Sequence, residues 1–197
     1  MKRLLSLLFF CCLLTAVTGA QEKAQPQRIQ LPPQAPMFSP ADLASKVPAA
    51  KPEDVKSMDA ILRAIYDVIS GPAGGRDWSR FRSIFLPQAR FTQVGTAPDG
   101  SKMVLTWSVD EFVRDAGEVF SKEPFYEKAI VNQPQSFGNV TQVFSSYESR
   151  HSPSDKPFDR GINSIQLLND GKRWWVLSIL WDSERADNPL PANFAGK

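Results

Sequence analysis

The sequence has 197 residues, of which 23 are lysine or arginine and 21 are aspartate or glutamate. A chain so close to neutrality lacks the basic surface that binds nucleic acid or anionic membranes, so neither class of partner is expected. It contains one histidine and two cysteines. These are too few for a standard zinc site in the mature chain, and we expect no metal and no cofactor.

The first 20 residues have the layout of a secretory signal peptide. Lys2 and Arg3 precede an apolar run at 4–14, and small residues at 18–20 predict cleavage after Ala20. The run is shorter than a membrane-spanning helix requires. We therefore expect an exported protein, periplasmic or extracellular, with no stable membrane insertion after cleavage.

Two alternatives for this segment are an uncut membrane anchor and a lipoprotein signal that uses Cys11 or Cys12. If the segment is removed, the mature chain holds no cysteine. Its stability must then come from a packed core and not from disulfide bonds.

Residues 21–51 are rich in Pro, Gln and Ala. Such a segment cannot bury enough apolar surface to offset its ordering entropy, so we expect a disordered leader. A tether between the domain and a partner is the functional alternative. The folded domain is placed at residues 52–185, and residues 186–197 are expected to form a flexible tail.

Helices are expected mainly in the early part of this domain. Pro52 suits a first helical turn, and apolar residues then recur at helical spacing up to Ile69. Asp77 is placed to cap a second helix. A third opens at Ser108 and Glu111, whose spacing is that of a capping box.

Strands follow, in a pattern typical of a segregated α+β fold. Gly138-Asn139 and Asp170-Gly171 are suited to tight turns between strands. The last strand is apolar on both faces, which predicts burial by the core on one side and by another surface on the other. The six expected strands span 89–94, 103–107, 127–136, 139–150, 160–169 and 173–182.

This order of elements resembles the nuclear transport factor 2-like superfamily, which includes ketosteroid isomerases and polyketide cyclase-like proteins. Local features that carry the resemblance are the helix ending at 64–69, the helix start at Asp77-Trp78, the segment 85–91 and the hairpin leading into 174–182. The resemblance implies a cone in which three helices pack in a curved, mainly antiparallel six-stranded sheet. It also implies a pocket at the open end and a homodimer through the sheet face.

The resemblance also implies candidate pocket residues. The isomerases' tyrosine falls on Tyr66, their late-strand acid falls near Asn163, and their general base falls near Gln93. An amide cannot accept a proton at any useful pH, so isomerase chemistry of that type is not expected. Trp107 is a fourth candidate, because tryptophans can line a pocket for an apolar ligand.

Other candidates for catalysis are few, and the catalytic residues stay unknown at this stage. His151 is expected in an exposed loop. The carboxylates expected near element ends are Asp67, Asp110, Glu148 and Asp182.

The leading hypothesis is an exported module that binds a small apolar molecule or acts as a dimeric assembly module. The alternative is a cyclase, isomerase or hydratase acting on a hydrophobic molecule.

Overall fold

The computed structural model describes residues 37–97 and 99–196, so the expected signal peptide and most of the expected leader lie outside the described residues. Five α-helices, six strands and one 3-10 helix make up this region. They are α1 (Pro40–Ala44), α2 (Pro52–Val55), α3 (Met58–Asp67), α4 (Trp78–Ile84), β1 (Phe85–Thr96), β2 (Lys102–Ser108), α5 (Val109–Lys122), β3 (Tyr126–Phe137), β4 (Val140–Arg150), β5 (Asp159–Asn169), β6 (Trp174–Ser183) and η1 (Ala192–Phe194).

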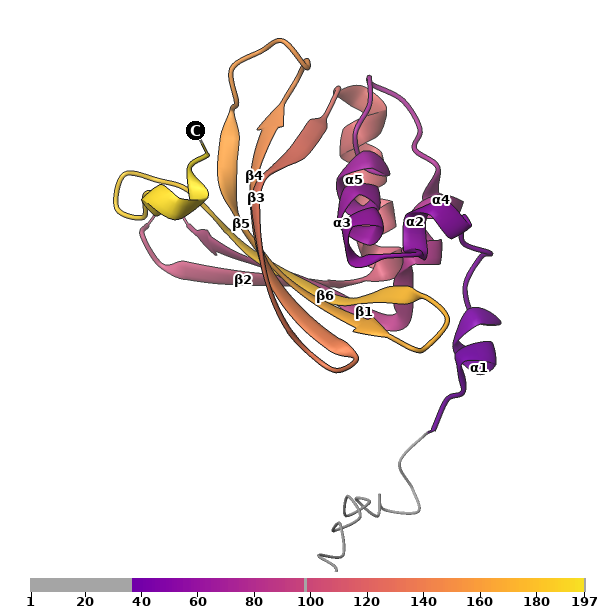
Figure 1. Cartoon of the computed structure of the whole chain (residues 1–197). Coiled ribbons are helices and arrows are strands. Elements are labelled where there is room, and N and C mark those ends of the chain that lie inside the picture. Colours follow the sequence, from indigo (N-terminus) through magenta and orange to yellow (C-terminus); the bar gives the residue numbers. More distant parts are fainter. Residues whose placement is uncertain (1–36, 98, 197) are drawn as a thin grey trace, which may run out of the picture. The chain divides into compact units, whose positions relative to one another are not determined.

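One curved sheet organises the domain, with α3 and α5 on its concave side (Figure 1). Its strand order is β2-β1-β6-β5-β4-β3, and every neighbouring pair is antiparallel except β1 and β6. The expected α+β cone with a mainly antiparallel six-stranded sheet is therefore confirmed. None of the helices in the described residues has the length and apolar character needed to cross a membrane.

Capping side chains set where the helices begin. The single helix expected from Pro52 is divided into α2 and α3, because the Ser57 hydroxyl accepts the N–H of Ala60 at 3.1 Å and starts a new helix. The capping box at the start of α5 is confirmed. The Ser108 N–H donates to the Glu111 carboxylate at 2.7 Å, and the Glu111 N–H donates back to the Ser108 hydroxyl.

Both expected boundaries of the domain differ from the structure. Residues 40–44 form α1 inside the expected leader, and Leu43 and Val47 pack against the core. At the other end, Phe194 is 7% exposed and packs against Phe144, while its carbonyl accepts the Ser146 hydroxyl at 2.7 Å. Apolar burial and this hydrogen bond hold the C-terminal segment on the sheet, where a loose tail was expected.

The outer, convex face of the sheet stays partly open. Trp175 and Val176 are fully buried, but Leu180 on the same strand is 44% exposed. The burial of β6 on both faces, expected from its composition, is thus incomplete within the described chain. A groove on this face is bordered by Leu180, by Phe144 and by Leu190, which belongs to the segment that follows β6.

The inner face of the sheet is crowded where β4, β5 and β6 meet. A Cβ atom added at Gly161 would lie 2.6 Å from the Tyr147 hydroxyl and would collide with the backbone carbonyl of Asp182. A backbone carbonyl in a paired strand cannot move aside cheaply, so this position requires glycine.

We predict that Gly161→Ala lowers the free energy of unfolding by about 2 kcal/mol, as overpacking of a tight site does. Gly95→Ala is the matched control, because a Cβ atom there meets no atom within 4 Å. It is expected to change stability by less than about 0.5 kcal/mol. Urea unfolding followed by tryptophan fluorescence measures both, and equal stability of the two variants would contradict the packing described.

Candidate functional site

A buried tyrosine connects α3 to the middle of the sheet. Tyr66 is 4% exposed, and its hydroxyl is hydrogen-bonded to the hydroxyl of Ser145 on β4. It also accepts a hydrogen bond from the amide of Asn163 on β5 at 3.2 Å. Ser145 and Asn163 face each other in the β4–β5 register. Burial raises the pKa of Tyr66, so the phenol stays protonated and remains a hydrogen-bond donor at neutral pH.

Beside this contact lies a cavity of about 350 Å³ enclosed by the helices and the concave sheet. Three of the four residues selected from the sequence line it: Gln93 on β1, Trp107 on β2 and Asn163 on β5. Tyr66 does not line this cavity; it borders the second hollow described below and is joined to the cavity through its hydrogen bond with Asn163. Whether these residues bind a ligand stays a prediction.

Aromatic rings form a large part of the cavity wall. Phe112 stacks on Phe91 with ring centroids 4.5 Å apart and on Phe81 at 5.4 Å. Trp107 stacks on Trp181 at 5.9 Å. Offset stacking of this kind holds each ring in one orientation, so the wall is a rigid apolar surface.

One part of the cavity lining is polar. Glu127, Ser149 and Asp159 come from β3, β4 and β5 and occupy one row of the sheet, because Ser149 pairs with both of the others. The Ser149 hydroxyl donates to Glu127 at 2.7 Å, and the Tyr147 hydroxyl donates to Asp159 at 3.0 Å. The cavity thus combines apolar walls with hydrogen-bonding groups at one end, as ligand sites commonly do.

Glu127 has an unusual protonation equilibrium. Burial raises its pKa to about 7, and the nearby negative charge of Asp159 adds to the shift, while hydrogen bonds from Ser149 and Asn163 oppose it. The backbone of Glu127 is fixed by Ser70, whose hydroxyl accepts its N–H at 2.9 Å and donates to the Tyr66 carbonyl at 2.7 Å. A carboxyl group that titrates near neutrality is suited to proton transfer.

Comparison with solved structures places this arrangement in a known fold. A protein of unknown function from Nostoc punctiforme, described as having a cystatin-like fold, aligns at a TM-score of 0.50 and 8% identity, over 66% of this chain and 89% of that one. The beta subunit of a proposed aromatic-ring-hydroxylating dioxygenase from Novosphingobium aromaticivorans aligns at 0.50 and 10% identity, over 66% and 90%. A proposed dehydratase of the nuclear transport factor 2-like family from Streptomyces avermitilis aligns at 0.49 and 12% identity, over 68% and 97%.

The curved, mainly antiparallel six-stranded sheet with helices on its concave side has the architecture of the nuclear transport factor 2-like fold. No family profile matches the sequence of this chain, and no curated protein matches it either. At these identities the likeness concerns the fold alone, so the function of this domain has to be argued from its own residues.

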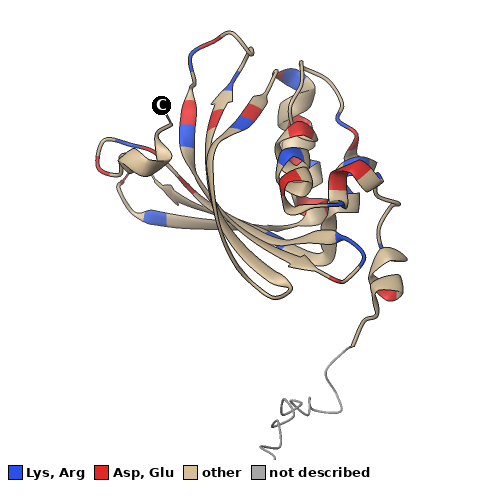
Figure 2. Cartoon of the chain, in the orientation of Figure 1, with Lys and Arg blue, Asp and Glu red and all other residues tan. Residues whose placement is uncertain are grey.

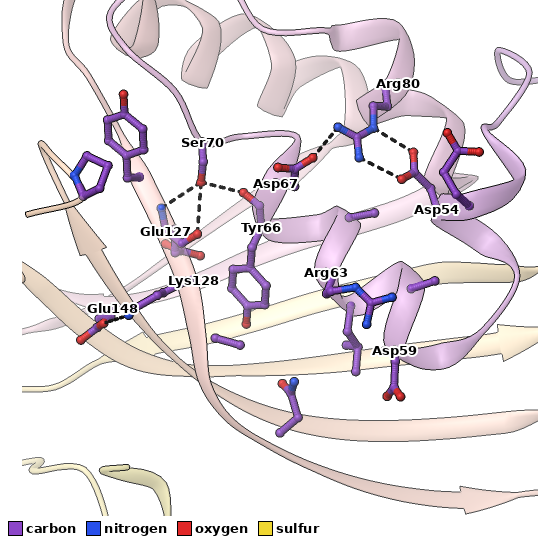
Figure 3. Close-up of a pocket in the computed structure, with 18 of the residues that line it drawn as sticks. Asp54, Asp59, Arg63, Tyr66, Asp67, Ser70, Arg80, Glu127, Lys128 and Glu148 are labelled. Atoms are coloured by element: carbon purple, nitrogen blue, oxygen red, sulfur yellow. Dashed lines mark hydrogen bonds and ion pairs between the residues drawn. The ribbon is translucent and has the colours of Figure 1, made fainter. Parts of the chain in front are cut away.

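A second hollow of about 960 Å³ lies between α3 and β3 and is bordered by charged side chains (Figure 3). Arg80 makes two contacts of 2.8 Å with Asp54 and also pairs with Asp67. On the strand side, Glu148 pairs with Lys128 and Arg150. The pairs made by Arg80 tie α2, α3 and α4 together, so we assign them a structural role, whereas the Arg150 Nε atom is buried without a hydrogen-bond partner in the described residues.

The carboxylates chosen from the sequence do not line the aromatic cavity of this nuclear transport factor 2-like domain. Asp67 and Glu148 belong to the ion pairs of the groove, Asp110 pairs with Arg82, and Asp182 pairs with Arg185. His151 is exposed, as expected, and stacks on Phe158.

Glu127 and Asp159 line the cavity instead, and the sequence analysis missed both. The alternation of β3 holds the signal that was missed. Lys128 is exposed and Ala129 is partly buried, so Glu127 is an acid at an inward-facing position.

The pKa of Glu127 predicts a specific dependence of stability on pH. Because the folded-state pKa of about 7 lies above the ordinary value of 4.5, the folded state binds this proton more tightly than the unfolded state. Stability conferred by the proton is complete below pH 4.5 and is lost as the pH rises to 7. The loss amounts to roughly 3 kcal/mol.

Glu127→Gln removes that ionisation, so the difference in unfolding free energy between variant and wild type should grow from pH 4.5 to pH 7 and then stay constant. Glu123→Gln, at an exposed position, is the control and should follow the wild-type curve. Urea titrations at a series of pH values measure these curves. Parallel curves for Glu127→Gln and wild type would show that Glu127 titrates normally.

Proposed function

We propose that this protein is an exported nuclear transport factor 2-like domain that binds a small apolar molecule in its aromatic cavity. The observation that supports the proposal most directly is the cavity itself, a hollow of about 350 Å³ at the centre of the fold. This volume falls in the range of small-molecule sites, which begins at roughly 300 Å³. A core that served packing alone would close such a space, because interiors are packed as densely as organic crystals.

Turnover in the same cavity is the second candidate function. The residue near the isomerases' base is Gln93, which cannot carry a proton, so an enzyme of this fold would need another group. Glu127, with its pKa of about 7 and its place on the cavity wall, is such a group.

Binding is tested with N-phenyl-1-naphthylamine, a neutral apolar dye whose fluorescence rises in apolar surroundings. We expect saturable binding to the wild-type protein and at least a tenfold loss of affinity in Ala116→Phe, because Ala116 lines the cavity and a phenyl ring would fill part of it. Ala41→Phe, on the exposed face of α1, is the matched control. Equal binding by both variants would place the dye outside the cavity and remove the support for this proposal.

The same preparation distinguishes binding from turnover. In deuterium oxide, an active proton-transfer group would exchange the hydrogens next to the carbonyl of 2-tetralone, which NMR detects. Exchange by the wild type that is lost in Glu127→Gln would favour the enzyme, whereas saturable binding without exchange favours the binding module.

Export and self-association complete the proposal. The mature N-terminus is expected at Gln21, and mass spectrometry of the secreted chain tests this. For self-association, the outer face of the sheet exposes Val104 (66%), Phe144 (46%) and Leu180 (44%). The halves of β3 and β4 that adjoin the turn between these two strands carry no charged residue (Figure 2).

We expect a homodimer through this face, because an apolar surface of this kind favours association. Sedimentation should give a dimer for the wild type and a monomer for Leu180→Arg. A monomeric wild type would contradict the proposed dimer and leave the cavity proposal untouched.

A further inference from the structure

The charges around the aromatic cavity are all of one sign. Among its lining residues, which the structure describes in full detail, the ionisable side chains at neutral pH are Asp115, Glu127 and Asp159, and none is lysine, arginine or histidine. These three acids come from α5, β3 and β5, so the negative charge of the lining is contributed by three separate elements. Asp115, at the rim, pairs with Arg114 at 2.7 Å. Glu127 and Asp159 lie at the inner, polar end.

The two inner carboxyl groups have only neutral partners in the described chain. Ser149 donates to Glu127, while Tyr147 and Ser183 donate to Asp159 at 3.0 and 3.2 Å. No ion pair involves either group within residues 37–97 and 99–196. A charge taken from water without an opposite charge costs free energy, which is also why the pKa of Glu127 rises.

Two other carboxylates with little solvent exposure are paired with basic side chains. Asp54 is 5% exposed and receives two hydrogen bonds from Arg80. Glu148, whose side chain is 14% exposed, is contacted by Lys128 and Arg150. For both of these acids the chain itself supplies a cation, whereas Glu127 and Asp159 form no ion pair within residues 37–97 and 99–196.

The rest of the cavity suits a cation that also has an apolar body. Trp107, Trp181 and Phe112 line the same cavity as the acids. Aromatic rings attract ammonium groups through their electron-rich faces, by about 0.5–2 kcal/mol, and they also bury apolar carbon. An anionic ligand would meet two carboxyl groups and an electron-rich wall, and would be repelled by both.

We propose that the molecule bound in this cavity is a hydrophobic amine, with its ammonium group at Glu127 and Asp159 and its apolar body against the aromatic wall. The inference rests on the proposed binding function and names the chemical class of its ligand. The cation replaces the partner that these acids lack, and its charge favours the ionised form of Glu127. Binding and proton release are therefore linked.

Three probes of one shape test the charge preference: 1-naphthylmethylamine, 1-naphthylmethanol and 1-naphthoate, titrated at pH 8 by quenching of tryptophan fluorescence. We expect the amine to bind at least tenfold more tightly than the alcohol, and the carboxylate to bind least. Equal affinity for amine and alcohol, or a preference for the carboxylate, would overturn the inference while leaving the binding function intact. Failure of all three to bind would instead count against the proposed function.

The pH dependence gives a second test on the unaltered protein. The groups that face Glu127 are Tyr66 on α3, Ser149 and Tyr147 on β4, and Asp159 and Asn163 on β5, and none of them carries a positive charge. Lys128, next along β3, pairs with Glu148. Amine affinity should therefore rise between pH 6 and pH 8 as Glu127 ionises, since a primary amine stays protonated over this range. Alcohol affinity should not rise.

Substitution then assigns the effect to the residue. Glu127→Gln should lose about tenfold in amine affinity and lose its pH dependence, while its affinity for the alcohol stays within twofold of wild type. Glu123→Gln, on the exposed surface, is the control. An amine affinity that is unchanged in Glu127→Gln, or flat with pH in the wild type, would contradict the proposed ammonium site.

Discussion

The hydrogen-bonded contact between Tyr66, Ser145 and Asn163 fixes how α3 sits in the concave sheet. It joins one helix to two adjacent strands, and all three side chains are buried. A phenol enclosed without these partners would cost roughly 1–3 kcal/mol in unsatisfied hydrogen bonding, so the helix is held at the depth where both bonds form. That depth leaves the cavity open, because Ile65 on α3 and Ile69 in the turn that follows it then form part of its wall without filling it.

The same helix end also determines the polar side of the cavity. Ser70, just beyond α3, accepts the N–H of Glu127 and donates to the carbonyl of Tyr66. Figure 3 shows Ser70 between these two residues. The position of Glu127 is thus set by the backbone of β3 and by α3, whereas its pKa is set by the side chains that surround the carboxyl group. Apolar rings on one side and hydroxyl groups on the other leave the carboxyl group balanced between its two protonation states.

The fold could be predicted from the sequence because its local signals agree with one another. The capping box at Ser108 and the turn at Gly138-Asn139 each set an element boundary to within a residue or two. The site was predicted less completely. Tyr66, Gln93 and Asn163 were selected through the resemblance and Trp107 as an aromatic residue able to line a pocket, but Glu127 and Asp159 were not selected, because the row that joins them through Ser149 depends on the register of three strands.

The C-terminal segment shows a different limit of sequence reasoning. Its prolines indicate a loose chain, yet Phe194 is buried against Phe144, about 50 residues earlier in the sequence. The conformational propensity of a short segment carries no information about the surface against which that segment packs. Tertiary contacts of this kind override local composition, and only the folded sheet shows where they form.

The position of β6 between β1 and β5 constrains the order in which the molecule can be assembled. β1 is made early and β5 follows only after β2, β3 and β4, but the strand that joins them is residues 174–183, close to the C-terminus. Until it is synthesised, β1 and β5 each present an unpaired edge to which another chain can add. Under the proposed export, a chain that crosses a membrane N-terminus first would reach the far compartment in this unfinished state. The interval before its last strand arrives is when a holdase chaperone would matter most.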